Sequence, residues 1–412
     1  MAYLEVLKVS SVFVLMVVLL RFKVNLGVAM LAATAYLAAL YRMALLTAVS
    51  VAAASAIAAP TLLLMATLYL IMVMEKVMSD EGLMKRMVSG LKVLVPDYRP
   101  VMAMMPALVG FLPSAGGAVF SAPLVEAVSS QYEVSPVRKS FINYWYRHIC
   151  EYTVPLYPGM ILAATMLGVP VTTIVKSLFP GSLASLLAGI PVAFSGLKRP
   201  VAAQETAPHS ERKKALLALA EATGPILAVL ALSVVFGLHL ATSLVVVVGA
   251  LLLVYRYSMK KALSVARRAF SPGTLLLVIG VMALKDMMEA SGAVEDLSAY
   301  MQGTGVSPLI LVFFLPFVAG LLTGYSPACV ALSYPLIINL LGTGIDAVRL
   351  GAVAYAVGFM GVMVSPVHLC LILTVEYFKA DLAKVYRAIF LPLLAPVAAI
   401  ALWNILVIGR LW

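Results

Sequence analysis

Apolar runs long enough to cross a membrane recur along the chain, separated by short polar connections. A spanning helix needs about 20 mostly apolar residues, and ten runs approach that length. The runs are residues 4–20, 24–41, 58–76, 151–168, 172–195, 216–236, 238–255, 271–285, 350–375 and 388–408. The pattern therefore predicts an all-α membrane protein with about ten transmembrane helices.

Each half of the chain also contains a pair of shorter apolar segments between its third and fourth runs. These segments have only about a dozen residues each, too few to span, and they flank a break rich in Gly, Pro and Ser. We therefore expect re-entrant hairpins at residues 100–130 and 306–341. A broken helix is expected after each hairpin, at residues 138–168 and 346–376.

The two halves resemble each other when the chain is shifted by 210 to 214 residues. The matching positions include Tyr41 with Tyr255, Gly82 with Gly292, Pro106 with Pro316, Gly110 with Gly320 and Pro155 with Pro366. Glycines and prolines kept in register are hard to explain by chance among apolar letters, so we interpret the match as a duplication. Residues 1–196 form the first repeat, 197–214 a cytoplasmic linker, and 215–412 the second repeat.

The number of crossings in each half determines how the two halves are oriented relative to each other in the membrane. Five crossings per half is an odd number, so the second half is expected to enter the membrane upside down, as an inverted repeat. Lys85 and Arg86 follow the third run of the first half, whereas Asp286 and Glu289 occupy the matching loop of the second. By the positive-inside rule the first loop is cytoplasmic and the second is outside. Both termini are then predicted to be extracellular, in a multi-pass protein of the cell (plasma) membrane.

Composition supports the same class. Hydrophobic residues make up 63% of the 412 residues and charged residues 11%, whereas a soluble domain carries roughly 25% charged residues. The formal net charge is +11, but the basic residues cluster in short loops between apolar runs, where they set orientation. We therefore expect the chain to interact with the lipid bilayer and not with nucleic acid.

Motifs for ATP-driven or metal-dependent chemistry do not occur in the sequence. It contains no Walker loop, no Gly-x-Ser-x-Gly elbow and no haem motif. Cys150, Cys329 and Cys370 lie singly inside apolar runs, which favours packing over a disulfide framework or a zinc site. We therefore expect no enzyme activity, no metal and no cofactor, with Na+ as a candidate bound ion.

The tips of the two hairpins are the first candidate binding residues. They are Ser114, Ala115, Gly116 and Gly117 in the first half, and Thr323, Gly324, Tyr325 and Ser326 in the second. Unpaired main chain in hydrocarbon costs several kcal/mol per group, so irregular backbone there has to line a cavity or be buried in protein. The amide end of the half-helix after each tip favours an anion. The alternative is a pair of kinked helices that pack through small residues.

The broken helices supply the second set of candidates. Glu151, Thr153 and Tyr157 lie in the first break, and Ser365 and His368 in the second. An ionisable residue inside a membrane is functional by default, so Glu151 and His368 are candidates for ion coupling, together with Thr323 and Gly324. A structural role is the alternative for both.

In that alternative, Glu151 is an ion-pair partner of Arg147 four residues earlier, and His368 is a buried packing residue. Thr153, Tyr157, Ser365 and His368 complete the predicted substrate-binding set.

Three stretches are similar to an uncharacterised archaeal and bacterial membrane family, domain of unknown function 401. They are Pro106 to Pro123, Asn143 to His148, and Gly358 to Cys370 with the later Glu376-Tyr377-Phe378. That family is grouped in the Ion Transporter superfamily, beside divalent-anion/sodium symporters, arsenite permeases, and gluconate and citrate carriers. The resemblance covers nearly the whole chain.

The resemblance implies a scaffold domain, a moving transport domain that contains both hairpins, and a homodimer that works by an elevator motion. By the same analogy, Ser114, Gly116 and Gly117, with Tyr325 and Ser326, would bind substrate or cation. The Ser-Asn-Thr signature of the dicarboxylate carriers is absent from both tips. Carboxylate and sodium recognition therefore does not transfer residue by residue.

The sequence favours a secondary active transporter of a small anionic solute, a carboxylate or oxyanion, coupled to Na+ or H+. A cation/proton antiporter that uses Glu151 and His368 is the alternative within transport. A membrane enzyme or flippase for a lipid-linked substrate, with Arg147, His148 and Glu151 as its polar site, is the alternative outside it.

Overall fold

The computed structural model describes residues 2–95, 97–111, 118–197, 208–293, 296 and 307–407. This part of the chain is helical throughout, with short connections and no strand among the described residues. The four residues expected at the first hairpin tip, Ser114 to Gly117, lie outside it. The all-α class predicted from the periodicity is therefore confirmed.

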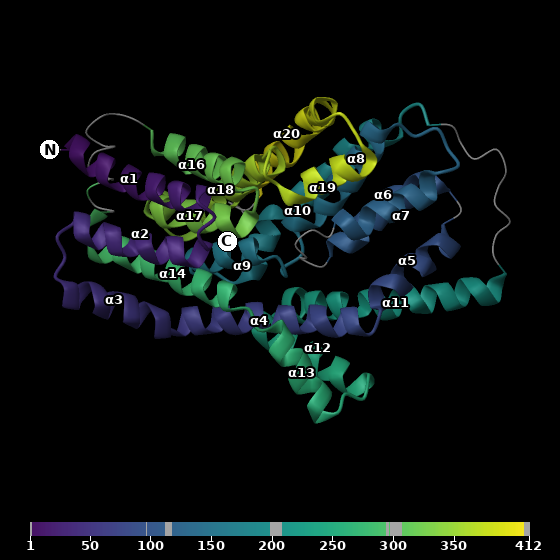
Figure 1. Cartoon of the computed structure of the whole chain (residues 1–412), viewed down its shortest axis with the longest axis horizontal. Coiled ribbons are helices and arrows are strands. Elements are labelled where there is room, and N and C mark those ends of the chain that lie inside the picture. Colours follow the sequence, from purple (N-terminus) through teal and green to yellow (C-terminus); the bar gives the residue numbers. More distant parts are fainter. Residues whose placement is uncertain are drawn as a thin grey trace.

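The first half forms ten α-helices in its described part, shown in purple to teal in Figure 1. They are α1 (Ala2–Arg21), α2 (Leu26–Leu40), α3 (Leu45–Ile57), α4 (Ala59–Asp80), α5 (Leu83–Leu94), α6 (Tyr98–Gly110), α7 (Ala118–Ser129), α8 (Pro136–His148), α9 (Pro158–Met166) and α10 (Val171–Phe194). A 3-10 turn, Ile149–Tyr152, continues α8.

The second half follows the same order in teal, green and yellow. Its helices are α11 (His209–Leu230), α12 (Leu240–Val254), α13 (Met259–Ala269), α14 (Pro272–Ala290), α16 (Pro308–Thr323), α17 (Ser326–Ile337), α18 (Gly344–Met363), α19 (Leu369–Phe378) and α20 (Leu382–Leu406). A π-helical turn, Ala231–Val235, extends α11, and a 3-10 turn, Ile338–Leu340, follows α17.

Five helices in the described part are long and apolar enough to cross a membrane. They are α4, α10, α11 with its π-helical turn, α18 and α20, and they coincide with five of the ten apolar runs. A sixth span results if α13 and α14, which meet at a bend of 53°, count as one. The structure thus supports a helical membrane protein and is compatible with several crossings, while the full number of about ten crossings stays a prediction.

The backbone repeats together with the element order. Residues in left-handed conformations recur at the ends of matching helices, at the same 210 to 214 offset seen in the sequence. The pairs are Lys23 with Gly237, Arg42 with Arg256, Gly82 with Gly292, and Gly168 with Lys379. Because non-glycine residues rarely take positive φ, the match reflects equivalent turns even where the residue type differs. The opposite orientation of the halves remains a prediction.

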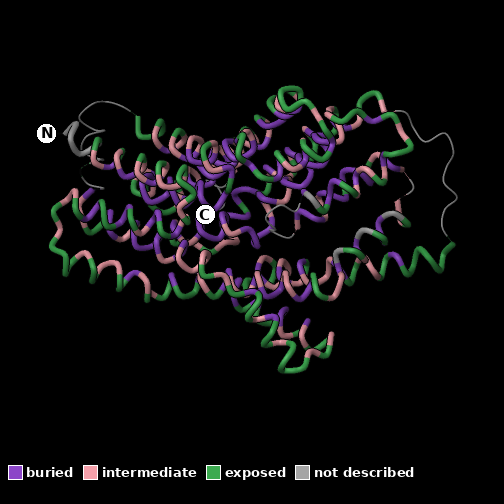
Figure 2. Tube along the Cα trace, in the orientation of Figure 1, coloured by how far each residue is buried: buried purple, intermediate pink, exposed green. Residues whose placement is uncertain are grey.

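Contacts between the halves are reciprocal. The first hairpin helix α7 packs on α19 of the second half, and its counterpart α17 packs on α9 of the first half. The last helices of the two halves, α10 and α20, pack against each other. Figure 2 shows buried positions in purple gathered toward the middle of the molecule, where these elements meet. The breaks in the helices are therefore placed in the interior.

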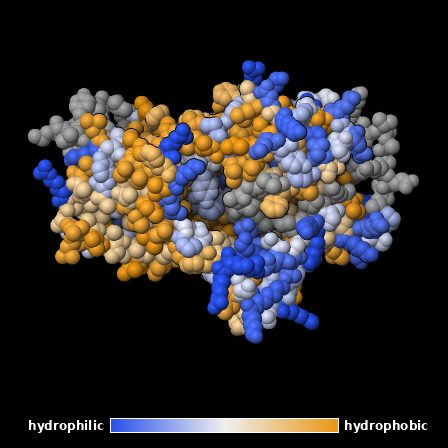
Figure 3. Space-filling model, viewed as in Figure 1, coloured by the Kyte–Doolittle hydropathy of each residue, from blue (hydrophilic) through white to orange (hydrophobic). Residues whose placement is uncertain are grey.

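Helix α13 differs from the helices around it because it is strongly basic. It protrudes at the lower edge of Figure 1 and is hydrophilic in Figure 3, whereas the surface over α1 to α3 is largely hydrophobic. Its Arg268 forms an ion pair of 2.5 Å with Asp80 at the end of α4, and its Lys261 one of 2.8 Å with Glu81. Basic residues of α13 thus lie at the end of α4, which precedes Lys85 and Arg86, the pair predicted from the sequence to be cytoplasmic.

Replacing Lys261 with methionine is expected to lower stability only slightly, because the ion pair with Glu81 is partly exposed and screened by salt. The Lys261 ammonium, hydrogen-bonded to Glu81, holds the pKa of that carboxyl below its usual range. The contribution of Glu81 is therefore present above the ordinary carboxyl pKa and is lost as pH falls through the lowered value. Thermal unfolding in detergent at two salt concentrations and several pH values tests this. A loss that is independent of salt would contradict it.

Candidate functional site

Two helix breaks, one from each half, meet in the interior of the molecule. Helix α8 ends at His148, a 3-10 turn follows, and α9 begins only at Pro158, because Pro155 and Pro158 cannot supply ladder N–H groups. In the second half α18 ends at Met363 and α19 begins at Leu369, with Pro366 between them. Both breaks were predicted from the sequence, within the ranges 138–168 and 346–376.

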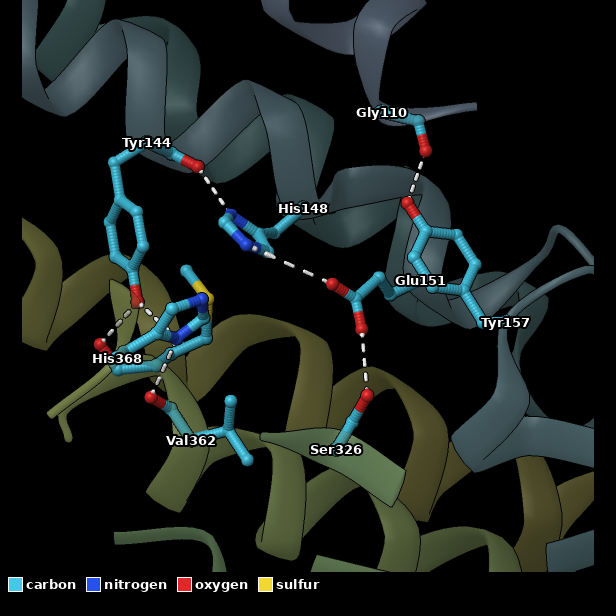
Figure 4. Close-up of polar contacts among 9 residues, drawn as sticks. Gly110, Tyr144, His148, Glu151, Tyr157, Ser326, Val362 and His368 are labelled. Atoms are coloured by element: carbon cyan, nitrogen blue, oxygen red, sulfur yellow. Dashed lines mark hydrogen bonds and ion pairs between the residues drawn. The ribbon is translucent and has the colours of Figure 1, made fainter. Parts of the chain in front are cut away.

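Glu151 joins the first break to the second hairpin. Its Oε2 accepts a hydrogen bond of 3.3 Å from the hydroxyl of Ser326, the first residue of α17. Its Oε1 lies 3.8 Å from Nε2 of His148 (Figure 4). Glu151 is only 7% exposed, so its carboxyl group depends on partners inside the protein. The amide end of α17 carries a partial positive charge and stabilises a carboxylate placed there.

His368 of the second break is held by α8 and by its own chain. Its Nδ1 lies 3.0 Å from the carbonyl oxygen of Val362 and 3.1 Å from the hydroxyl of Tyr144. Tyr144 in turn donates its hydroxyl to the carbonyl oxygen of Met363, at 2.9 Å. A carbonyl oxygen can only accept, so Nδ1 of His368 carries a proton. In neutral His368 the free lone pair is therefore on Nε2.

His148 is oriented in the same way. Its Nδ1 lies 2.7 Å from the main-chain oxygen of Tyr144, so this nitrogen donates and Nε2 keeps the lone pair in neutral His148. One donor atom each from His148, His368 and Cys370 lie within 4.8 Å of one another, and all three residues are buried. This cluster was not predicted from the sequence, because His148 comes from the first half and His368 and Cys370 come from the second.

Arg147 is the residue that would compensate the charge of Glu151 if Glu151 has only a structural role. Its side chain is buried, at 5% exposure, and its positive charge acts on the Glu151 carboxylate. Compensation of Glu151 by Arg147, the alternative considered from the sequence, therefore remains open. Both roles are compatible, since a buried carboxylate requires charge compensation whatever it binds.

Four other predicted site residues donate their hydroxyl groups to partners within the protein. Tyr157 is buried and donates its hydroxyl to the carbonyl oxygen of Gly110, and Thr153 donates to Ser182 on α10 at 2.5 Å. Thr323 and Ser365 donate to main-chain oxygens in and near α16, each at 2.7 Å. These hydroxyls have partners in the protein, so they fix the breaks and hairpins in position.

The second hairpin tip is close to His368. Gly324 is in a left-handed conformation at the end of α16, and a Cβ on it would lie 2.7 Å from the main-chain nitrogen of His368. Tyr325, the next residue, is half exposed, whereas Ser326 is buried against Glu151. Of the predicted site residues, the structure thus brings Glu151, Ser326, Gly324 and His368 together. The first tip, Ser114 to Gly117, is outside the described residues.

Cavities near the cluster are small. One of about 10 Å³, room for about one water molecule, is lined by His148, Tyr152, Phe359 and Met363 among others. A larger apolar pocket of about 500 Å³ lies between α4 and the start of α14, lined by Leu62, Tyr69 and Phe270 among others. The larger pocket shares none of its lining with the polar cluster. The described residues of the cluster are thus buried beside a small cavity.

A helical membrane protein with broken helices and ionisable side chains in its interior is the class that this fold and site define. Within that class, the chain belongs to the family described as protein of unknown function (DUF401), whose model matches residues 5–408. No curated protein matches the sequence of the chain. The resemblance found in the sequence is thus confirmed at the level of this family.

Proposed function

We propose that the chain is a secondary active transporter that moves a small ionic solute by alternating access, coupled to H+ or Na+. The observation that carries the proposal is the contact between Glu151 and Ser326. It joins a buried carboxylate of one half to the first residue of a hairpin helix of the other half. Ion and substrate sites of transporters typically lie where discontinuous helices of two repeats meet.

The finer parts of the mechanism are proposals of the same kind. Reciprocal packing of α7 on α19 and of α17 on α9 is what two inverted repeats would produce. An elevator motion, with both hairpins in the moving domain and a homodimeric scaffold, follows from the superfamily resemblance. We propose this arrangement for the cell membrane, with both termini outside.

The described residues bear on whether the solute is an anion or a cation. The amide end of α17, which favours an anion, faces the carboxylate of Glu151. An anionic solute, the class expected from the sequence, would have to share that end with Glu151. A cation has carboxylate, imidazole and thiol groups available, so the described residues favour the second candidate, a cation/proton antiporter.

A site for a lipid-linked substrate has less support. Arg147, His148 and Glu151 are 5%, 4% and 7% exposed. A lipid headgroup would need an open polar groove to reach these groups, and the cavity beside His148 holds about one water molecule. We therefore place transport ahead of lipid chemistry and propose no enzyme activity.

Proteoliposomes that contain the purified chain and an internal pH indicator test the proposal. With an imposed pH gradient, addition of Na+, Zn2+ or a small carboxylate is expected to collapse the gradient through the protein. Liposomes without protein are the control for leakage. If folded protein moves no cation or anion under any imposed gradient, the proposal is wrong.

A further inference from the structure

We propose that His148, His368 and Cys370 form a binding site for a soft d10 metal cation, Zn2+ or Cu+. Two imidazoles and a thiolate are the donors that such cations prefer among protein side chains. The three donor atoms already lie within 4.8 Å of one another in a buried position between the two halves. Neither the composition nor the family indicates this site.

The hydrogen bonds of the two histidines are those expected of metal ligands. Histidines that bind metal donate their other ring N–H to a carbonyl or carboxylate, which fixes the ring and its tautomer. Nδ1 of His148 is held by the oxygen of Tyr144 at 2.7 Å, and Nδ1 of His368 by the oxygen of Val362 at 3.0 Å. Both rings therefore leave Nε2 as the atom available to a metal. The same pattern, with Nδ1 hydrogen-bonded to a main-chain oxygen, thus occurs in both histidines of the cluster.

The donors would have to move closer together to hold a metal. In a tetrahedral site, metal–nitrogen bonds of about 2.0 Å and metal–sulfur bonds of about 2.3 Å place the donor atoms roughly 3.3–3.6 Å apart. The donor atoms here lie within 4.8 Å of one another, so the most distant pair would have to approach by roughly 1 Å, which rotation of the side chains can supply. Oε1 of Glu151, 3.8 Å from Nε2 of His148, is the nearest candidate for a fourth ligand.

The three donors come from both halves of the chain. His148 is the last residue of α8, His368 precedes α19, and Cys370 is in the first turn of α19. The site therefore joins a helix end of the first half to a helix start of the second half. Identification of this cation as the transported solute rests on the proposed function, whereas its binding does not.

Titration of the reduced, full-length chain in detergent tests binding directly. Co2+ serves as the probe for the zinc arm, because thiolate coordination gives it a charge-transfer absorption band, and Zn2+ is then added to displace it. Cu+ is measured separately against a competing chelator. We expect one cation per chain, and a dissociation constant raised at least about tenfold in Cys370→Ser and His368→Gln.

Matched controls come from the chain itself. Cys329 is also buried, with its thiol 3.2 Å from the oxygen of Pro316, and His209 is exposed at the start of α11. Cys329→Ser and His209→Gln are expected to bind as the wild type does. Unchanged affinity in Cys370→Ser, or no binding of either cation to the wild-type chain, would overturn the site. The wild-type measurement does not depend on how the variants fold.

The same preparation in proteoliposomes separates this inference from the proposed function. Gradient-driven ion movement by a chain that binds neither Zn2+ nor Cu+ would overturn the metal site and leave transport standing. Tight binding of Zn2+ or Cu+ without any gradient-driven ion movement would support the metal site. It would overturn the idea that this cation is the transported solute. Binding together with Zn2+ or Cu+ movement, both weakened in Cys370→Ser, is the expected result.

Discussion

Alanine at Gly320 is expected to destabilise the chain strongly, whereas alanine at Gly249 should stabilise it slightly. A Cβ on Gly320 would lie 2.1 Å from the main-chain oxygen of Gly358 and 2.8 Å from the nitrogen of Val362. Both atoms belong to the backbone of α18, which cannot move aside as a side chain does, so α16 and α18 would have to separate. Overpacking of this kind costs about 1–3 kcal/mol, occasionally more, and the upper end applies here.

Gly249 supplies the control because it lies inside α12 with nothing within 4 Å of its added Cβ. Alanine in a helix interior is favoured over glycine by roughly 0.5–1 kcal/mol. Thermal unfolding in detergent, followed by size-exclusion chromatography, measures both variants. Equal stability of Gly320→Ala and Gly249→Ala would show that α16 and α18 do not approach as closely as described.

The first half offers an internal replicate of this effect. A Cβ on Gly110 would lie 2.1 Å from the main-chain oxygen of Arg147, on α8. Gly110 and Gly320 are matched by the sequence repeat, and each marks the contact of a hairpin helix with the broken helix that follows it. The sequence could predict the equivalence of these glycines. The close helix contact that requires them depends on packing and could be seen only in the structure.

Proline and glycine made the local breaks predictable. Pro155 and Pro366 remove N–H groups from the helical ladder, and both fall in breaks that the structure contains. Gly324 takes the left-handed conformation that ends α16, as the predicted tip requires. Such effects act within a few residues of one another, so they can be derived without knowing the tertiary structure.

The side-chain partners could not be predicted in this way. Thr153 and Ser365 were expected to bind substrate, but each donates its hydroxyl to a neighbouring group of the protein. Buried hydroxyls are nearly always satisfied, and which partner they find depends on helix packing. For the same reason Cys370 looked like a packing residue, although it lies beside His148 and His368. The cluster of His148, His368 and Cys370 forms only because the two halves meet.

Replacing Glu151 with glutamine is expected to reduce gradient-driven ion movement at least about a hundredfold while the chain stays folded. Glutamine keeps the shape and can still accept the hydrogen bond from Ser326, so the contact with α17 is preserved. The charge that would attract a cation is removed. Removing one partner of a buried, hydrogen-bonded charge pair in a binding site costs roughly 2–5 kcal/mol of binding free energy. Each 1.4 kcal/mol corresponds to about tenfold in affinity, so a loss of about 3 kcal/mol, within that range, is about a hundredfold.

Glu126→Gln is the matched control for this variant. Glu126 lies on the first hairpin helix and pairs with Lys139 at 2.9 Å, but its side chain is 40% exposed. Loss of this exposed pair is worth no more than about 1 kcal/mol, so transport and stability should both be close to wild type. Flux per folded molecule and the unfolding temperature are measured for both variants in the same lipid.

The pair of measurements also separates the two interpretations of Glu151. If the carboxylate only compensates the buried charge of Arg147, removing it leaves that charge in the interior, and Glu151→Gln should unfold at a lower temperature. The molecules that remain folded would then transport at the wild-type rate. If Glu151 binds the moving ion, flux per folded molecule falls whatever the unfolding temperature does. A stable variant with unchanged flux would exclude both roles.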